Sequence, residues 1–383
     1  MGFAYEFKEE YRYLLNVLRC GINKLGFPHK PENISWESVY RLSRRHGISA
    51  LTYHIIKNCG ADLDTEIQDK WSADYSKIMV QSSNQQYELG KLVQVFSDHK
   101  IPHMILKGSL IRDLYPLPEL REMSDLDFFI SRDCHAAVSE LLADLGYQFE
   151  SDDGAHLAFI KKPHVCVEIH AELMKRADRY LDALKDPWKR AVPIKTDYCF
   201  RMCDEDFYIF QIVHAAKHYY HGGTGIRSVL DIYLYLKNYR DKLDWEYIDQ
   251  TISGKELRNF RKNIEGLSEY WFGDGPASDD ISEMEYYILR SATYGKAELR
   301  IENTVQRYID KGMSPAHARA ACFFHMAFLP IGEMEYIYPC LRKAPVLLPV
   351  CWVARWCRIL VKRPQSIKKR YKEAKQVVSY KDK

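Results

Sequence analysis

The sequence lacks the signals that assign a class of protein at first sight. Its ten cysteines form no Cys-x-x-Cys pair. Cys199 and Cys203 lie four residues apart without a histidine at a ligand spacing, so we expect no zinc site. The N-terminal stretch contains no apolar signal-peptide core. Scattered thiols without an export signal predict a cytoplasmic protein, because exported proteins commonly pair their cysteines.

Long hydrophobic runs are also missing. The apolar stretch from Val346 to Val353 is broken by Pro349. It is far shorter than the roughly 20 residues that cross a bilayer, so we expect no transmembrane segment. The chain contains no internal repeat and no low-complexity region. Its 383 residues, 46% hydrophobic and 28% charged, suffice for a globular protein of two or three domains.

Charge is low overall but unevenly distributed. The net charge is +3, yet residues from Arg355 to Lys383 carry eleven lysines and arginines against two acids, a net of +9 that leaves −6 for the rest. Trp352 and Trp356 give this basic tail an apolar anchor if the segment is helical. Three roles stay open for the tail: contact with an anionic membrane surface, contact with RNA phosphates, and a solvated basic helix.

The spacing of apolar residues divides the chain into helical and mixed parts. Helical spacing fills residues 5–100 and returns from about residue 204, whereas alternating runs between these parts predict strands. We therefore expect an α+β fold in which a small mixed sheet is embedded in a mainly helical protein. The expected parts are a helical N-terminal cap at 1–100, an α/β core at 101–200, a helical domain at 201–312, and a C-terminal helical segment with the basic tail at 313–383.

The most informative pattern is Asp125-Leu126-Asp127 inside an apolar run that ends at Ile130. Residues two apart in a strand share a face, so both carboxylates are expected to point the same way. Such a pair is costly unless a cation neutralises it, and hard oxygen ligands suit Mg²⁺ or Mn²⁺. We therefore predict that Asp125 and Asp127 are catalytic metal ligands. The alternative is a solvated strand edge.

A phosphate-binding turn is predicted upstream, where a strand over 103–107 ends in Lys107-Gly108-Ser109. Gly108 permits the close approach of a ligand, and Ser109 is expected to N-cap a helix that begins near Leu110. The N-terminus of a helix favours a triphosphate, to which Lys107 and Arg121 add positive charge. The alternative is a plain helix cap with two surface cations.

A third acid is expected from a hairpin that turns through Lys162-Pro163. Its second strand, 164–170, alternates apolar residues with Cys166, Glu168 and His170. Glu168 is thus predicted to face away from the core and to join the aspartates, as a metal ligand or as the acceptor of a proton. His170 is expected to support the site rather than to act as its base.

A second polar cluster is predicted on two later helices. His214, Lys217 and His218 recur at helical spacing, and Arg227 and Asp231 lie one turn apart, where we expect an i,i+4 ion pair. Two interpretations stay open for this cluster, with which we group His170: a helical domain closes over the substrate so that Lys217 or Arg227 contacts phosphate, or the residues form an interhelical polar network. Metal binding by the two histidines alone is not expected, because a third ligand is lacking.

Together these motifs resemble a known family. Lys-Gly-Ser, Leu-Tyr-Pro and Arg followed by Ser-Asp-Leu-Asp are similar to the uncharacterised bacterial nucleotidyltransferase family of the polymerase-beta type, as are Val-Glu-Ile-His at 167–170 and the polar cluster at 214–231. The resemblance runs from about residue 80 to residue 240. The 15 residues between Ser109 and Asp125 exceed the spacing usual in the superfamily, although this family tends to carry such an insertion.

The resemblance implies a nucleotidyltransferase fold and a metal-dependent enzyme. It would move a nucleoside monophosphate from a nucleoside triphosphate to an unidentified acceptor, with Mg²⁺ (or Mn²⁺) as cofactor. A rival of the same class is a phosphoryl or pyrophosphoryl transferase. A rival of a different class is a catalytically silent fold that acts as a binding or membrane-associated module.

Overall fold

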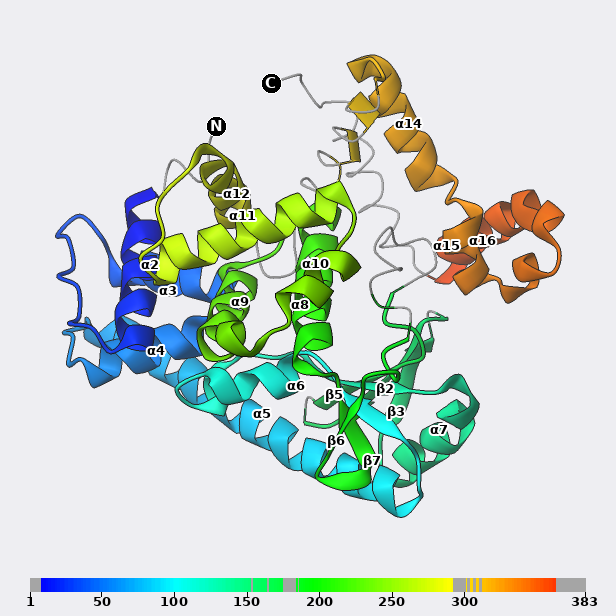
Figure 1. The fold of residues 1–383 in the computed structure, drawn as a ribbon, viewed down its shortest axis with the longest axis horizontal. Helices are drawn as coiled ribbons and strands as arrows, with labels where there is room; N and C mark the ends of the chain where they lie inside the picture. The colour runs from blue at the N-terminus through cyan, green and yellow to red at the C-terminus, as the bar shows by residue number, and fades with distance from the viewer. Residues whose placement is uncertain are drawn as a thin grey trace.

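The structure is a computed structural model of the chain. It describes residues 8–152, 154–163, 165–174, 184, 186–291, 301, 304–305, 308–309 and 312–362. One seven-stranded mixed sheet lies among helices (Figure 1). The expected α+β fold, mainly helical with an embedded sheet, is therefore confirmed.

The sheet has the strand order β3-β4-β5-β2-β1-β7-β6. β2 runs parallel to β5 and β1 runs parallel to β7, whereas the other neighbours are antiparallel. The predicted hairpin is confirmed as the pair β4 and β5. The strands are β1 (His103–Ile105), β2 (Asp125–Ile130), β3 (Gln148–Asp152), β4 (His156–Lys161), β5 (Val165–His170), β6 (Val192–Ile194) and β7 (Thr196–Arg201).

One face of the sheet is covered by the longest helix. α5 (Thr65–Asp98) runs from the N-terminal helices to the sheet and passes beneath it in the view of Figure 1. Its residues Leu92 and Phe96 pack in one core with Phe128 and Val167 of the sheet. The other helices before residue 150 are α2 (Lys8–Asn23), α3 (Trp36–Arg45), α4 (Ser49–Asn58), the single turn α6 (Gly108–Ile111) and α7 (His135–Asp144).

The opposite face of the sheet meets the helices that follow it in the chain. Phe129 of β2 shares a large core with Phe210 and Val213 of α8 (Asp204–His221), and the N-terminal helices belong to the same core. The prediction of four separate parts along the chain stays a prediction. The helices beyond α8 in this region are α9 (Ile226–Tyr239), α10 (Trp245–Thr251), α11 (Lys255–Phe272) and α12 (Asp279–Arg290).

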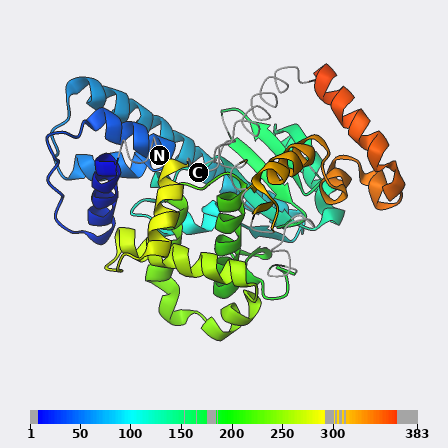
Figure 2. The ribbon, with the colours of Figure 1, turned by 90° about the horizontal axis from the view of Figure 1, so that it is seen from above.

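Three helices, α14 (Pro315–Ala327), α15 (Ile331–Ile337) and α16 (Leu348–Lys362), form the C-terminal end of the described chain. They lie at the end of the molecule far from α2 in both ribbon views (Figures 1 and 2). They have a small core of their own around Met334 and Leu341.

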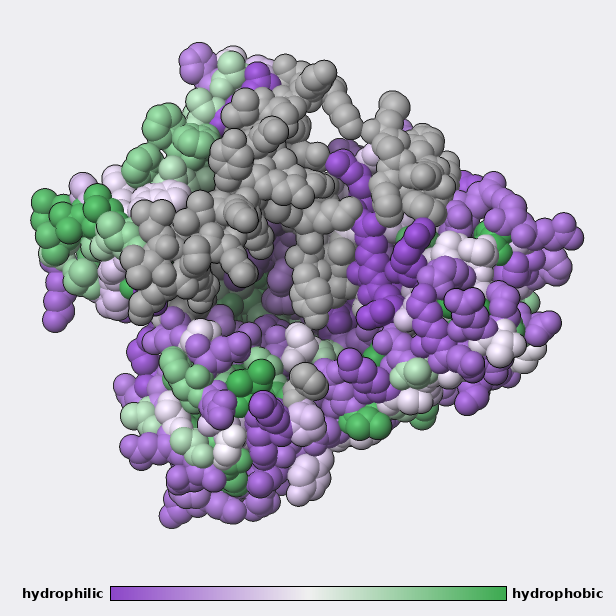
Figure 3. Space-filling view, turned by 180° about the vertical axis from the view of Figure 1, so that it is seen from behind, coloured by the Kyte–Doolittle hydropathy of each residue, from purple (hydrophilic) through white to green (hydrophobic). Residues whose placement is uncertain are grey.

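The surface of these C-terminal helices is partly apolar. Phe324, Val346, Val350 and Val353 are exposed, Val346 to 82%. Hydrophobic residues gather over this region in the space-filling view (Figure 3). Within the described residues, no helix combines the length and the hydropathy needed to cross a membrane.

The two tryptophans of α16 contact the protein itself. The indole N–H of Trp352 donates to the carbonyl of Leu329 at 2.8 Å, and that of Trp356 donates to the carbonyl of Ala327 at 3.1 Å. Their side chains therefore hold α16 against the end of α14. The basic tail beyond Lys362 lies outside the described residues.

Candidate active site

The carboxylates of Asp125 and Asp127 lie on one face of β2, as the period of a strand requires. The Asp127 side chain is only 4% exposed. Burial and the neighbouring Asp127 carboxylate raise the pKa of Asp125 to about 6. The pair is thus held close together in a poorly solvated place, where a second negative charge is expensive.

Lys107 neutralises part of this charge. Its Nζ lies 2.6 Å from Oδ1 of Asp127. Although burial opposes it, the carboxylates of Asp127 and Asp125 raise the pKa of Lys107. In return, despite its own burial, Asp127 has a pKa well below the usual range because of Lys107 and His170. Lys107 is therefore a charged partner of Asp127 rather than a surface cation.

Glu168 is the nearest neighbour of Asp127 in the sheet. The parallel register of β2 and β5 pairs Asp127 with Glu168, so the predicted adjacency of the third acid is confirmed. Nε2 of His170 lies 2.8 Å from Oδ1 of Asp127 and 3.3 Å from Oε2 of Glu168. His170 thus links the two carboxylates, in agreement with a supporting position. The catalytic and metal-binding roles of these residues stay predictions.

The turn after β1 differs from the prediction in one respect. α6 begins at Gly108 and its N-cap is Lys107, which has φ +46°, so the prediction that Ser109 N-caps this helix is wrong. The helix starts earlier because the positive φ of Lys107 turns the chain two residues before the serine. Ser109 lies inside the turn, and its buried Oγ has no hydrogen-bond partner among the described residues.

Gly108 has a packing reason to be glycine. A Cβ at this position would lie 2.1 Å from Nη1 of Arg121 and 2.9 Å from the sulfur of Met123. The turn and the segment that precedes β2 therefore touch each other directly. Arg121 therefore lies against the Lys107-Gly108-Ser109 turn, and phosphate binding at this turn stays a prediction.

Most of the Arg121 guanidinium contacts Asp231 of α9. Its Nε and Nη2 donate to the two carboxylate oxygens of Asp231 at 3.0 and 2.7 Å, and the hydroxyl of Tyr115 donates to the same carboxylate at 2.7 Å. The prediction of an ion pair between Arg227 and Asp231 is therefore wrong. A partner from a distant segment, fixed in a bidentate geometry, takes the place of the local one.

Helix α8 brings His214 and His218 near Lys107. Nε2 of His214 lies 3.1 Å from Nε2 of His218. Burial, His218 and the charge of Lys107 lower the pKa of His214 well below its usual range. Burial and the charges of Lys217 and Lys107 lower the pKa of His218 to about 4. Both rings are therefore neutral at pH 7 and act as hydrogen-bonding groups rather than cations.

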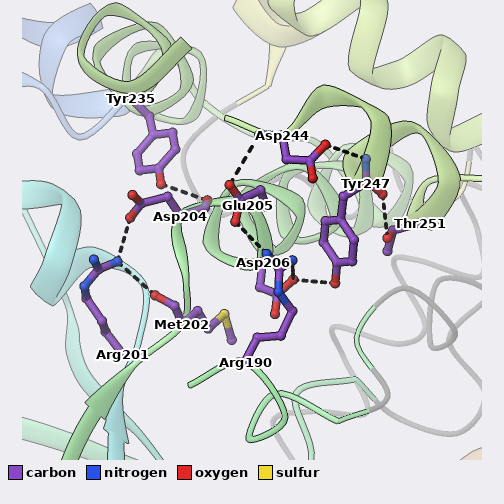
Figure 4. Close-up of polar contacts among 10 residues, drawn as sticks. All are labelled: Arg190, Arg201, Met202, Asp204, Glu205, Asp206, Tyr235, Asp244, Tyr247 and Thr251. Carbon is purple, nitrogen blue, oxygen red and sulfur yellow. Dashed lines mark hydrogen bonds and ion pairs between the residues drawn. The ribbon is translucent and has the colours of Figure 1, made fainter. Parts of the chain in front are cut away.

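The beginning of α8 is held by ionic contacts (Figure 4). The guanidinium of Arg190 lies 3.0 Å from Glu205 and 3.4 Å from Asp206. The hydroxyl of Tyr247 donates to Asp206 at 2.7 Å. Acids in the first turn also suit the positive end of a helix. These contacts hold the helix that carries His214 in its position over the sheet.

Two residues of this region escaped the sequence-based prediction. Gln211 precedes His214 by three residues on α8, and both polar atoms of its side chain are buried without a partner among the described residues. Its helical spacing to His214 was the available signal. His156 of β4 lies opposite His170, and the hairpin register was the signal for that residue.

Arg227 lies away from the carboxylates. It donates a hydrogen bond to the backbone carbonyl of Glu122. Together with Arg44, Arg45 and Glu122 it lines a cavity of about 180 Å³ that Met123 also lines. The residues predicted as a second cluster are therefore separated: His170 contacts Asp127, Asp231 holds Arg121, and Arg227 lines this cavity.

The residues present fit a divalent cation. Asp125, Asp127 and Glu168 stand on one face of two adjacent parallel strands, near Lys107, and burial together with the Asp127 carboxylate raises the pKa of Asp125. Carboxylates and hydroxyls are the oxygen ligands that hard cations prefer. The unpartnered Oγ of Ser109 supplies a further polar atom close by.

A family model described as an uncharacterised nucleotidyltransferase matches residues 32–273, which is more than half of the chain. The matched segment includes β1, β2, β5, α8 and α9, and with them every residue of the carboxylate site named above. Comparisons with curated proteins and with solved structures give no match.

Proposed function

This chain belongs to the uncharacterised nucleotidyltransferase family, and from that premise we propose that it transfers a nucleoside monophosphate to an acceptor hydroxyl with release of pyrophosphate. The observation that supports this reaction is the convergence of Asp125, Asp127 and Glu168 on one face of the sheet, beside the Lys107-Gly108-Ser109 turn. In such a transfer, the acceptor oxygen bonds to the α-phosphorus as the bond to the pyrophosphate oxygen breaks.

Asp125, Asp127 and Glu168 would hold Mg²⁺ or Mn²⁺. A divalent cation bound by these carboxylates would offset phosphate charge and lower the pKa of the attacking hydroxyl. Metal dependence is part of the proposal, because three carboxylates beside one lysine leave an excess of negative charge that a triphosphate could not otherwise approach.

The residues of the chain contribute binding, orientation and proton transfer. Lys107 supplies positive charge at the turn, and the Ser109 hydroxyl, buried without a partner in the described residues, is available to a phosphate oxygen. α6 is a single turn, so its dipole adds little and the side chains bear most of the binding. Since Asp127 contacts Lys107, Asp125 and Glu168 are the better acceptors for the proton of the attacking hydroxyl.

The proposal is tested by pyrophosphate release from the four nucleoside triphosphates, with Mg²⁺ or Mn²⁺ and a panel of hydroxyl acceptors. Asp127→Asn should lower the rate at least about a hundredfold, since ligands of reacting phosphates contribute several kcal/mol. The matched control is Asp133→Asn, an exposed aspartate six residues later in the chain, which should retain the parent rate.

The products separate this proposal from its rivals. Release of a nucleoside diphosphate would assign phosphoryl transfer. Release of a free nucleoside monophosphate without free pyrophosphate would assign pyrophosphoryl transfer, because the pyrophosphoryl group then moves to the acceptor. Equal rates for the parent and Asp127→Asn would contradict a catalytic role of this carboxylate. Absence of turnover with every acceptor, together with retained nucleotide binding, would favour the silent binding module.

A further inference from the structure

Two histidines and an acid converge on the hairpin next to the carboxylate pair. Donor atoms of His156, Glu168 and His170 all lie within 4.8 Å of one another. Nε2 of His156 is 3.7 Å from Oε1 of Glu168, and Nε2 of His170 is 3.3 Å from Oε2 of the same carboxylate. The centroids of the His156 and His170 rings are 5.2 Å apart. Small rotations of these side chains would close the three donors around one ion.

The register of the hairpin explains the convergence. β4 and β5 pair His156 directly with His170. Glu168 precedes His170 by two residues and therefore lies on the same face. All three side chains stand on paired strands rather than on loops, so the set is preorganised. Their side chains are 25%, 22% and 11% exposed, which leaves an ion a way in from solvent.

The chemistry of these donors differs from that of the aspartate pair. Mg²⁺ prefers an all-oxygen shell, whereas imidazole nitrogen suits Mn²⁺, Zn²⁺ and the other first-row divalent ions. Oδ1 of Asp127 lies 2.8 Å from Nε2 of His170, so a further oxygen stands beside the set. Two nitrogens and one or two oxygens make a mixed shell that disfavours Mg²⁺.

We propose that His156, Glu168 and His170 bind a first-row transition-metal ion, with Glu168 shared between this ion and the aspartate site. The binding claim stands on the hairpin geometry alone. Its meaning for catalysis rests on the proposed function, because Glu168, the third carboxylate of the proposed metal site, would also ligate an ion held by two imidazole nitrogens. The consequence is a preference for Mn²⁺ over Mg²⁺ at the Glu168 end of the site.

The experiment measures Mn²⁺ binding to the full-length, chelator-stripped protein without nucleotide. Electron paramagnetic resonance of free Mn²⁺ gives stoichiometry and affinity, and pulsed measurements detect nitrogen nuclei bound to the ion. We expect one Mn²⁺ per chain with nitrogen modulation from imidazole, and resistance to an equal concentration of Mg²⁺. His156→Ala should weaken Mn²⁺ binding at least about tenfold, because even residues outside the ligand shell cost about 10–100-fold.

Two controls isolate the site. His29→Ala removes an exposed histidine on a loop and should leave Mn²⁺ binding unchanged. Asp125→Asn should keep nitrogen-coordinated Mn²⁺ within about threefold while losing turnover, since Asp125 is no member of the histidine set. Circular dichroism of each variant confirms that it is folded.

Three results would overturn the inference: no Mn²⁺ binding by the parent protein, bound Mn²⁺ without nitrogen modulation, or equal Mn²⁺ affinity in His156→Ala and the parent. Nitrogen-coordinated Mn²⁺ in a protein that releases no pyrophosphate would support this inference and count against the proposed function. If the protein has no nitrogen-coordinated Mn²⁺ but turns over with Mg²⁺, and His156→Ala retains that turnover, the result would support the proposed function and overturn this inference.

Discussion

Among single residues, Asp125 lies in an environment that disfavours its charged form. Its carboxylate is partly buried next to that of Asp127, and Lys107 contacts only the latter. A group whose folded pKa lies above its unfolded value contributes stability below the unfolded pKa and loses it as the pH rises through the folded pKa. For Asp125 that window runs from about 3.8 to about 6.

Asp125→Asn should therefore stabilise the metal-free protein at neutral pH. The variant removes a charge that is costly above pH 6, so we expect a gain of about 1–2 kcal/mol at pH 8, after allowing for partial exposure, and little difference at pH 4. Urea unfolding with chelator present measures both values. A variant that is less stable than the parent at pH 8 would mean that Asp125 makes a stabilising contact in the folded state.

Ser109→Ala tests whether the buried hydroxyl of the turn awaits a ligand. Its Oγ has no partner in the described chain, so the substitution removes no internal hydrogen bond and should leave stability unchanged or raise it by up to about 1 kcal/mol. Nucleotide affinity should fall by about 1 kcal/mol, measured by calorimetry. Ser82→Ala is the matched control, because Ser82 Oγ accepts a hydrogen bond from buried Arg112 at 2.7 Å and its loss should destabilise the protein without affecting nucleotide.

Among the elements, the long segment between α6 and β2 depends on α9 for its position. Tyr115 and Arg121, both in that segment, meet at Asp231 on α9. The Arg121 and Asp231 side chains are 11% and 13% exposed. The segment has little regular structure of its own. We therefore expect Gly108 and Met123 to stay close together only while the contacts of Tyr115 and Arg121 with Asp231 are intact.

Asp231→Ala should accordingly destabilise the fold strongly. It leaves the guanidinium of Arg121 buried without its carboxylate, which costs about 3–5 kcal/mol. The exposed pair of Lys70 and Glu37, 48% and 54% exposed, gives a control, because Glu37→Ala should cost no more than about 1 kcal/mol. Similar losses in the two variants, measured by thermal and urea unfolding, would mean that Asp231 is not the anchor of this segment.

The elements that the sequence predicted are those with a clear apolar pattern. β5 alternates buried and partly buried residues, and β2 is a buried run after its first residue. Both strands are found within one or two residues of the expected bounds. β3 was missed because all five of its residues are exposed and polar or aromatic at the sheet edge. The position of His214 over Lys107 depends on how α8 packs against the sheet, which no local pattern contains.

About half of the contacts in the site could be predicted from the sequence. A two-residue turn at Lys162 and Pro163 would pair His156 with Ile169, whereas the structure pairs His156 with His170, so the histidine pair was predictable only to within one residue of register. The pairing of Arg121 with Asp231 was not, because 110 residues separate them. Contacts of this kind are decided by the tertiary fold and outweigh the local i,i+4 preference of Arg227 for Asp231.

In the whole molecule, charge and exposed apolar surface meet at the C-terminal end. The net charge of +9 from Arg355 to Lys383 contrasts with −6 in the rest of the chain. α16 exposes Val350 and Val353, to 64% and 63%, and hydrophobic residues gather over the C-terminal helices in Figure 3. An apolar helix face joined to a cationic segment is typical of proteins that rest on an anionic lipid surface.

Deleting residues 364–383 should therefore weaken binding to vesicles that contain anionic lipid and spare the nucleotide site. Each lysine or arginine near such a surface contributes up to about 1 kcal/mol, and the attraction falls as salt shortens its range. Sedimentation of the full-length protein with anionic vesicles should decrease with salt and with the deletion, whereas nucleotide affinity should stay within about twofold because the deletion removes no residue of the carboxylate site. Neutral vesicles and a single-stranded RNA serve as controls. Binding to RNA alone would assign the tail to nucleic acid, and binding to neither polyanion at low salt would leave it a solvated end whose charge serves solubility.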